Sequence, residues 1–264
     1  MNKEDIFLIE DTHCDIIKKA RQGKGLSIRS LSDQLAVQPQ KLLAIEAGRE
    51  EFFPELADSL GLSFKKLLAI YNGDYRHKEI PEKIGEELVL KRFVVEIGGI
   101  TSNAYVLARG HYGLFVDAVG VSNEAFHFAR EKGVEPRFLL ITHGHFDHNA
   151  GVESILRTYP GMNVFYGGRD IKDDTHFETN GFSIEVLRAR GHTEDSVCYF
   201  VNSSIMFVGD TIFAGSVGRP NYSYEALLQN IKEKIFTLPD SVILAPGHGP
   251  LTTVGEEKKH NPFF

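Results

Sequence analysis

The chain has 264 residues, of which 42% are hydrophobic and 25% are charged, a balance typical of globular proteins with one large domain or one medium and one small domain. Its net charge of −7 argues against a protein whose main role is to coat nucleic acid or an anionic membrane. Only two cysteines occur, no apolar run reaches membrane-spanning length, and the start Met1–Asp5 lacks the basic and apolar parts of a secretory signal, so we expect a cytoplasmic protein without membrane partners.

Residues 1–73 show the spacing and punctuation of several short helices. Ser27 and Ser63 are suited to cap helices, and Pro39 and Pro54 suit first helical positions. The segment 74–87 is charged and contains a proline and a glycine, which is typical of a linker. We therefore predict a small helical domain at 1–73, followed by a linker at 74–87.

From residue 88 onward, strand-like and helix-like runs are mixed. We expect no strict alternation of strand and helix, which favours two sheets flanked by helices over a doubly wound fold. The second domain is therefore predicted at 88–264. Strands are expected at 88–96, 104–109, 113–117, 138–141, 164–166, 197–201, 205–208 and 242–245, helices at 123–132, 152–158 and 223–236, and a hairpin turn at 180–181.

Four residues of metal-ligand type follow directly after the strand expected at 138–141. They are His143, His145, Asp147 and His148. Residues two apart in extended backbone face the same way, so His143 and His145 can hold one cation. Asp147 and His148 come where the chain turns into a helix, and they can serve a second cation.

Three further ligand types each stand beside a glycine at the end of a strand-like run. Glycine allows the backbone to turn sharply close to an ion. A single buried histidine is more often a hydrogen-bonded core residue than a ligand, but the clustering at strand ends favours a metal site. We predict two metals, one bound by His143, His145 and His192, the other by Asp147, His148 and His248, with Asp210 as the bridge.

Four segments carry a resemblance to a known family: Thr142–His148, Gly191–Thr193, Gly209–Arg219 and Ala245–Phe264. They resemble the metallo-β-lactamase superfamily and, more narrowly, its glyoxalase II-like thioester hydrolases of the short bacterial type. The resemblance covers residues 88–264. It implies an αββα sandwich of α/β (α+β) class with a dinuclear metal site at one edge.

The chemistry expected of such a site is hydrolysis. A hydroxide that bridges two metals is a strong nucleophile at neutral pH and would attack a thioester carbonyl, with Asp147 as the catalytic residue that orients it and carries its proton. Arg219, with Tyr222 or Tyr224, could bind a polar or anionic end of the substrate, although Arg219 equally suits a surface ion pair. Zinc is the expected metal, and iron and manganese accept the same ligands.

Two other functions stay open for this domain. One is a mononuclear-iron persulfide dioxygenase, which Gly209–Arg219 also resembles. The other is a DNA-binding regulator whose metal domain senses a metabolite.

The N-terminal helices resemble the helix-turn-helix domain of the phage-repressor (XRE) type. The resemblance rests on residues 16–21, 25–27, 31–35, 45–49 and 56–61. It implies that Gln38, Gln40 and Lys41, at the start of the third helix, read bases in the major groove. Residues 1–75, however, hold 10 Lys plus Arg against 12 Asp plus Glu, a net charge of −2, whereas DNA binding relies on phosphate neutralisation. Two roles therefore stay open for these helices: DNA binding, or dimerisation or covering of the active site. A homodimer is one expectation of the second role.

Overall fold

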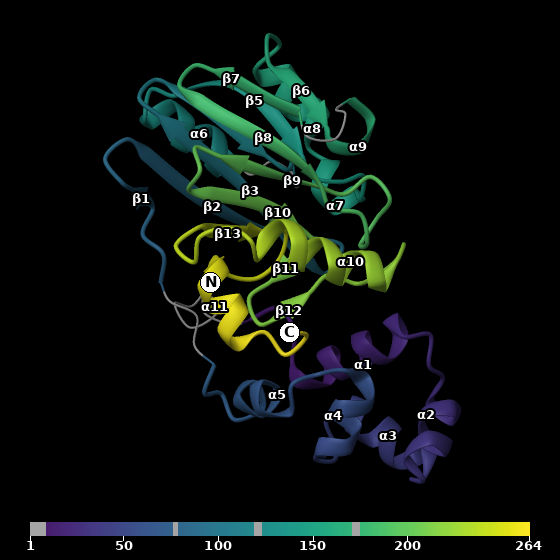
Figure 1. Ribbon diagram of the computed structural model, residues 1–264. Helices are drawn as coiled ribbons and strands as arrows, with labels where there is room; N and C mark the ends of the chain where they lie inside the picture. The colour runs from purple at the N-terminus through teal and green to yellow at the C-terminus, as the bar shows by residue number, and fades with distance from the viewer. Residues whose placement is uncertain (1–8, 76–78, 119–122, 171–174) are drawn as a thin grey trace.

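The computed structural model describes residues 9–75, 79–118, 123–170 and 175–264 (Figure 1). The N-terminal part is helical, as predicted, and the last four of its helices begin at the expected residues. Ser27 and Ser63 accept capping hydrogen bonds from the backbone N–H groups of Ser30 and Lys66, and prolines occupy the first positions of two helices. These helices, which we call the helical module, are α1 (His13–Gly23), α2 (Ile28–Leu35), α3 (Pro39–Glu46), α4 (Pro54–Leu60) and α5 (Phe64–Tyr71).

The rest of the chain forms two six-stranded sheets and a two-stranded sheet. The first sheet has the order β1 (Lys83–Ile84), β2 (Leu88–Ile97), β3 (Ile100–Arg109), β4 (Tyr112–Val116), β5 (Glu135–Ile141) and β6 (Asn163–Tyr166). The second has the order β14 (Thr252–Thr253), β13 (Ile243–Pro246), β10 (Ile205–Gly209), β9 (Val197–Val201), β8 (Phe182–Arg188) and β7 (Thr175–Thr179). The two-stranded sheet pairs β11 (Ile212–Phe213) with β12 (Ser216–Val217).

The two large sheets pack face to face. One apolar cluster joins Leu107 and Leu140 of the first sheet to Tyr199 and Phe207 of the second, so the main core lies between them. Every residue of β9 and β10 is buried, as expected for strands that are covered on both faces.

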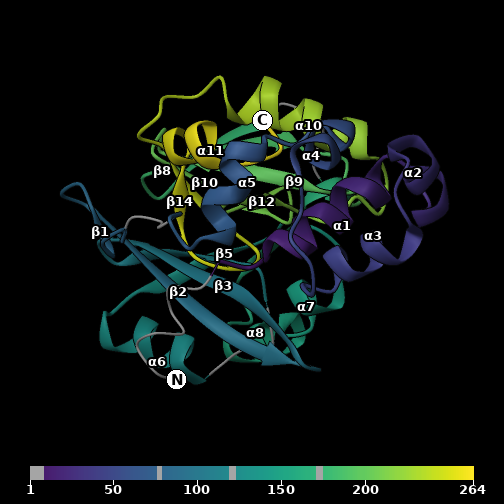
Figure 2. The ribbon, with the colours of Figure 1, turned by 90° about the horizontal axis from the view of Figure 1, so that it is seen from below.

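Helices cover the outer face of each sheet, which completes the predicted αββα sandwich. Figure 2 shows α6 and α8 on the outer side of β2 and β3, with α10 and α11 beyond the second sheet. The helices against the first sheet are α6 (Asn123–Glu131), α7 (Phe146–Asn149) and α8 (Val152–Thr158), while α9 (Gly167–Asp170) contacts strands of both sheets. The helices against the second sheet are α10 (Tyr224–Asn230), which continues as a π-helical turn at Ile231–Ile235, and α11 (Val254–His260).

Several short elements were not predicted. Lys83 and Ile84, inside the segment predicted as a linker, pair with β2 as β1, and three of that segment's residues, 76–78, lie outside the described part of the chain. The strands β11, β12 and β14 and the helix α11 were also missed. Two-residue strands have no hydrophobic period to detect, so only tertiary pairing reveals them.

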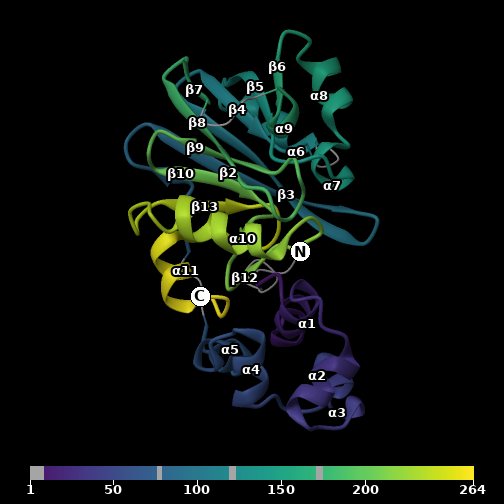
Figure 3. The ribbon, with the colours of Figure 1, turned by 45° about the vertical axis from the view of Figure 1, so that its right-hand side comes forward.

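The helical module packs against the sandwich beside β12, α11 and the C-terminus (Figures 1 and 3). A single apolar cluster contains Ile16 and Leu67 of the module together with Met206 and Phe263 of the sandwich. None of the helices in the described ranges is both long and apolar enough to cross a membrane.

Candidate metal centre

The predicted ligands come from strand ends that meet at one edge of the sandwich. His143 and His145 follow β5, and Asp147 and His148 lie in α7 directly after it. The other three come from the second sheet: His192 follows β8, Asp210 follows β10 and His248 follows β13. Residues more than a hundred positions apart therefore converge, because both sheets direct the ends of these strands to the same place.

The structure brings three histidines together as one potential metal position. His143 Nε2 lies 3.1 Å from His145 Nδ1, and His192 Nε2 lies 2.9 Å from the same atom. Nitrogen ligands of a tetrahedral ion with bonds of about 2.0 Å stand about 3.3 Å apart, so these spacings are close to those of a binding site.

A second group lies next to the first. Asp147 Oδ2 lies 3.5 Å from His248 Nε2 and 3.7 Å from His148 Nε2. Asp210 lies between the two groups: its Oδ2 is 3.4 Å from His192 Nε2 and 3.3 Å from His248 Nε2, and its Oδ1 is 3.3 Å from His148 Nε2. All seven predicted ligands therefore lie together, with Asp210, predicted as the bridge, between the two groups.

Oxygen atoms around the cluster orient three of the histidine rings. His148 Nδ1 contacts Asp117 Oδ2 at 2.9 Å, His192 Nδ1 contacts the carbonyl of Arg219 at 2.6 Å, and His248 Nδ1 contacts the carbonyl of Thr101 at 2.6 Å. If each Nδ1 donates to its oxygen, each Nε2 is left unprotonated and faces the centre.

Electrostatics favour the protonation states that bind cations at two of these positions. Burial, with His148 nearby, lowers the pKa of His143 well below its ordinary value, so this ring is neutral. Burial alone would raise the pKa of Asp210, but His248 and His148 hold it well below its usual range, so this group is ionised. Burial would lower the pKa of His148, but Asp210 and Asp117 outweigh it and raise that pKa well above 6.5.

The cluster fits divalent cations. His148 Nε2 and Asp210 Oδ1 are buried and face each other at 3.3 Å, but neither makes a well-aligned hydrogen bond among the described residues, and burying such atoms poorly paired is costly. Imidazole nitrogens and carboxylate oxygens are also the donors that zinc, iron and manganese accept. A pair of cations would therefore satisfy buried atoms that make no well-aligned hydrogen bond within the described part of the chain.

Gly247 is required by the close approach of the backbone to this cluster. A Cβ atom at this position would lie 2.2 Å from Asp210 Oδ1 and 2.6 Å from His148 Cε1. The glycine that precedes His248 therefore keeps the space beside the carboxylate open.

The predicted substrate residues are only partly brought to the centre. Arg219 holds His192 through its carbonyl and has an exposed side chain, and Tyr222 is 51% exposed and bonded through its N–H to Gly191. The Tyr224 ring instead packs where a Cβ on Gly23 would meet it at 2.5 Å, in the contact between α10 and α1. Its location gives no support to the substrate-binding role predicted for it.

The three predicted DNA-reading residues lie together at the start of α3. Gln38 immediately precedes the helix, and Gln40 and Lys41 are in its first turn. All three side chains are exposed, and Lys41 Nζ lies 4.9 Å from the centre of the Phe53 ring. Ala36, left-handed at φ 52°, ends α2 in the turn that leads into α3.

Sequence reasoning missed two residues that support the ligands. Asp117 accepts hydrogen bonds from the backbone and the hydroxyl of Thr142 as well as contacting His148, and Ser102 donates to Asp147 Oδ2 at 2.9 Å. A charged residue at the end of the buried strand expected at 113–117 was a usable signal for Asp117. No sequence signal pointed to Ser102.

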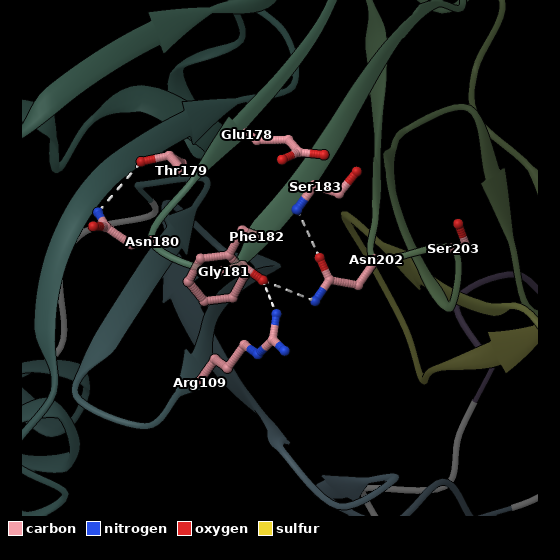
Figure 4. Close-up of a pocket in the computed structure, with 9 residues that line it drawn as sticks. All are labelled: Arg109, Glu178, Thr179, Asn180, Gly181, Phe182, Ser183, Asn202 and Ser203. Carbon is pink, nitrogen blue, oxygen red and sulfur yellow. Dashed lines mark hydrogen bonds between the residues drawn. The ribbon is translucent and has the colours of Figure 1, made fainter.

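A cavity of about 550 Å³ lies elsewhere, around the turns that end β7 and β9 (Figure 4). Its wall includes Arg109, Asn180 and Asn202 and none of the seven predicted ligands. Arg109 donates to the carbonyl of Gly181, and Asn202 contacts both Gly181 and Ser183 (Figure 4). This cavity is therefore separate from the metal centre.

Comparisons with known proteins identify both parts of the chain. The sequence model described as metallo-beta-lactamase superfamily matches residues 97–164 and 159–248, and the one described as helix-turn-helix domain matches residues 16–62. The chain is 30% identical over 199 residues to a probable metallo-hydrolase, YqgX, of Bacillus subtilis, which covers 64% of this chain and 94% of that protein. It is 29% identical over 184 residues to the hydroxyacylglutathione hydrolase GloC of Haemophilus influenzae, with 56% and 85% covered.

Solved structures superpose on the sandwich part of the chain and agree with the superfamily match. The B3 metallo-beta-lactamase BLEG-1 superposes with a TM-score of 0.61 at 28% identity over 66% of this chain and 99% of its own. The protein TTHA1623, solved in a di-iron-bound form, superposes with a TM-score of 0.56 at 26% identity over 65% of this chain and 100% of its own.

Proposed function

Because this chain belongs to the metallo-beta-lactamase superfamily of metal-dependent hydrolases, we propose that it cleaves thioesters at a dinuclear metal site. The observation that carries the proposal is the position of Asp210, whose two oxygens face His148, His192 and His248 at 3.3 to 3.4 Å. Such a carboxylate can hold two cations at once. The similarity to GloC, by name a hydroxyacylglutathione hydrolase, supports the substrate class, because an acyl group carried on the sulfur of glutathione is a thioester.

The residues around the site divide the chemical work. Two divalent cations bound there would lower the pKa of water to about 7 and supply a hydroxide at neutral pH. We assign to Asp147 the orientation of the attacking water and the transfer of its proton, because its Oδ2 faces His148 and His248 while Ser102 fixes the carboxylate. A thiolate leaves with little acid assistance, so one carboxylate is enough for a thioester.

The substrate would reach the centre past Arg219, whose carbonyl contacts His192, and past Tyr222, whose N–H bonds to Gly191. It would also pass Phe146, which stands in the sequence between two predicted ligands and is 68% exposed. An exposed phenylalanine beside two ligands is suited to contact an apolar acyl chain. The Arg219 side chain can contact a polar end of the substrate.

The proposal is tested with purified protein loaded separately with zinc, iron and manganese and assayed on thioester, lactone and persulfide substrates. We expect thiol release from thioesters, and loss of both turnover and bound metal in Asp210→Ala. The control is Asp58→Ala, which removes an exposed carboxylate of α4. Sulfite formation from a persulfide, without thioester hydrolysis, would favour the dioxygenase alternative instead.

A second candidate function is DNA binding by the helical module. The helix-turn-helix match and the shared exposure of Gln38, Gln40 and Lys41 support it. We expect the full chain at micromolar concentration to retard genomic fragments at low salt, and the triple alanine variant at these positions to lose that retardation. If the unmodified chain retards nothing, the DNA-binding hypothesis fails, and the module serves the hydrolase domain.

A further inference from the structure

The segment that leads into α1 lies against the metal centre. The backbone of Glu10 packs on Gly249, where a Cβ would meet Glu10 N at 3.2 Å and Glu10 Cβ at 3.3 Å. Gly249 directly follows His248 and has a φ of +71°, a left-handed conformation that suits glycine. The N-terminal segment therefore touches the loop that carries one of the seven predicted ligands.

The carboxylate of Glu10 faces that ligand. Its Oε1 lies 4.0 Å from His248 Nδ1, and its side chain is 31% exposed. His248 Nδ1 already contacts the carbonyl of Thr101 at 2.6 Å, so it does not neutralise Glu10 through a hydrogen bond. Glu10 thus places a partly solvent-accessible carboxylate at the rim of the centre, within ion-pair distance of His248.

Buried neighbours fix this position. Asp11 is buried and accepts hydrogen bonds of 2.5 Å from Lys19 Nζ and from Ser216 Oγ. Lys19 Nζ also donates to the carbonyl of Val217 at 2.9 Å, and Thr12 caps α1. Glu10 is therefore anchored between α1 and the β11–β12 pair rather than being part of a free tail.

The segment that precedes α1 supplies this carboxylate. The metallo-beta-lactamase match begins at residue 97, so Glu10 lies outside the region shared with that superfamily. We infer that Glu10 is a specificity-determining residue: its carboxylate repels an anionic group on the substrate beside His248 and favours a neutral or cationic one. This inference rests on the proposed thioester hydrolase, in which Phe146 contacts the acyl chain. It disfavours substrates whose thiol part, which would then lie beside His248, carries a carboxylate.

The test uses thioesters with one acyl group and thiol parts of equal size that carry an ammonium, a neutral amide or a carboxylate. The wild type is expected to prefer the ammonium substrate to the carboxylate one, and Glu10→Gln to reduce that kcat/KM ratio by about fivefold, mainly through a lower KM for the carboxylate substrate. The effect should shrink as salt is raised. Glu178→Gln, which removes an exposed carboxylate on β7, is the matched control and should leave the ratio unchanged.

Binding of the corresponding thioether analogues, measured by calorimetry, gives a readout that does not need turnover. Elemental analysis checks that Glu10→Gln holds as much metal as the wild type. If hydrolysis occurs and the ratio is the same in Glu10→Gln, the inference fails while the proposed function stands. An equal loss for all three substrates, or a loss of metal, would make Glu10 a support for His248 and would also overturn it. If no thioester is cleaved, the proposed function fails, and the analogue affinities alone decide the role of Glu10.

Discussion

The hydroxyl of Tyr75 donates to a fully buried carboxylate, and its removal should destabilise the whole chain. Tyr75 Oη lies 3.0 Å from Glu257 Oε1, which also accepts from Thr252 at 2.7 Å, while Gly215 N–H and Asn261 Nδ2 donate to Oε2 at 2.9 Å. Glu257 has no exposed surface. It therefore depends on these four donors to remain ionised.

The variant Tyr75→Phe removes one donor and little else. A hydrogen bond to a buried charged group contributes about 1.5 to 3 kcal/mol, so we expect the free energy of unfolding to fall by about 2 kcal/mol. In a chain of this size, that loss lowers Tm by about 4 to 8 °C. The control is Tyr71→Phe, on α5, whose side chain is 42% exposed and which should change stability by less than about 0.5 kcal/mol.

The structure also predicts how the stability loss in Tyr75→Phe changes with pH. Burial raises the pKa of Glu257 above its ordinary value of 4.5, and the donors only partly offset this. A raised carboxyl pKa gives stability that is present below the unfolded value and is lost as the pH rises through the folded value. Tyr75→Phe raises that pKa further, so its deficit should grow with pH.

Urea unfolding followed by circular dichroism at several pH values measures both effects. The reasoning is wrong if Tyr75→Phe matches Tyr71→Phe in stability, or if its deficit is largest at acid pH. Either result would mean that Glu257 is not an ionised acceptor in this contact.

Three further outcomes follow from the metal centre. Gly247→Ala should contain at least about tenfold less bound metal than the wild type, as measured by elemental analysis, because its Cβ would occupy space beside Asp210. Gly161→Ala is the control and should keep its metal, since its Cβ would meet nothing within 4 Å. Asp117→Asn should weaken metal binding by about 10- to 100-fold in competition with a chromophoric chelator, since it removes the charge that faces His148 Nδ1. Removal of metal by a chelator should lower the free energy of unfolding, and metal restored at 100 times its Kd should return about 2.7 kcal/mol; an unchanged Tm in calorimetry would argue against a preformed site.

Local sequence signals predicted the parts of the fold that are set locally. Caps and prolines predicted the starts of the helices from α2 to α5. Apolar runs located β5, β10 and β13, which precede six of the seven predicted ligands, whereas β8, which precedes His192, was expected only as part of a hairpin. The sequence pattern pointed to the seven predicted ligands as one group because each follows a strand and most stand beside glycine. Polar and charged side chains so densely spaced after a buried strand also rarely serve packing alone. Their role as metal ligands remains a prediction, although the geometry agrees with it.

Long-range packing explains what sequence reasoning missed. Tyr75 and Glu257 are 182 positions apart, and nothing near either residue in the sequence indicates the other. The position of Tyr224 depends on how α1 docks on α10, where Gly23 leaves room for its ring. Glu10 reaches His248 only because Asp11 is buried against β12, a two-residue strand without any periodic signal.

Packing contacts cross the boundary predicted between a helical domain and a hydrolase domain. Ile16 and Leu67 share one apolar cluster with Met206 and Phe263, and Lys19 of α1 donates to β12 next to the segment that carries Asp210 and Arg219. Separation of the two parts would expose this cluster and remove the donors and acceptors that meet across it. Since apolar burial of this kind is the main source of stability, the helical module and the sandwich should unfold in one cooperative transition. The module is therefore expected to be an integral part of the folded hydrolase and not an independently folded domain on a flexible linker.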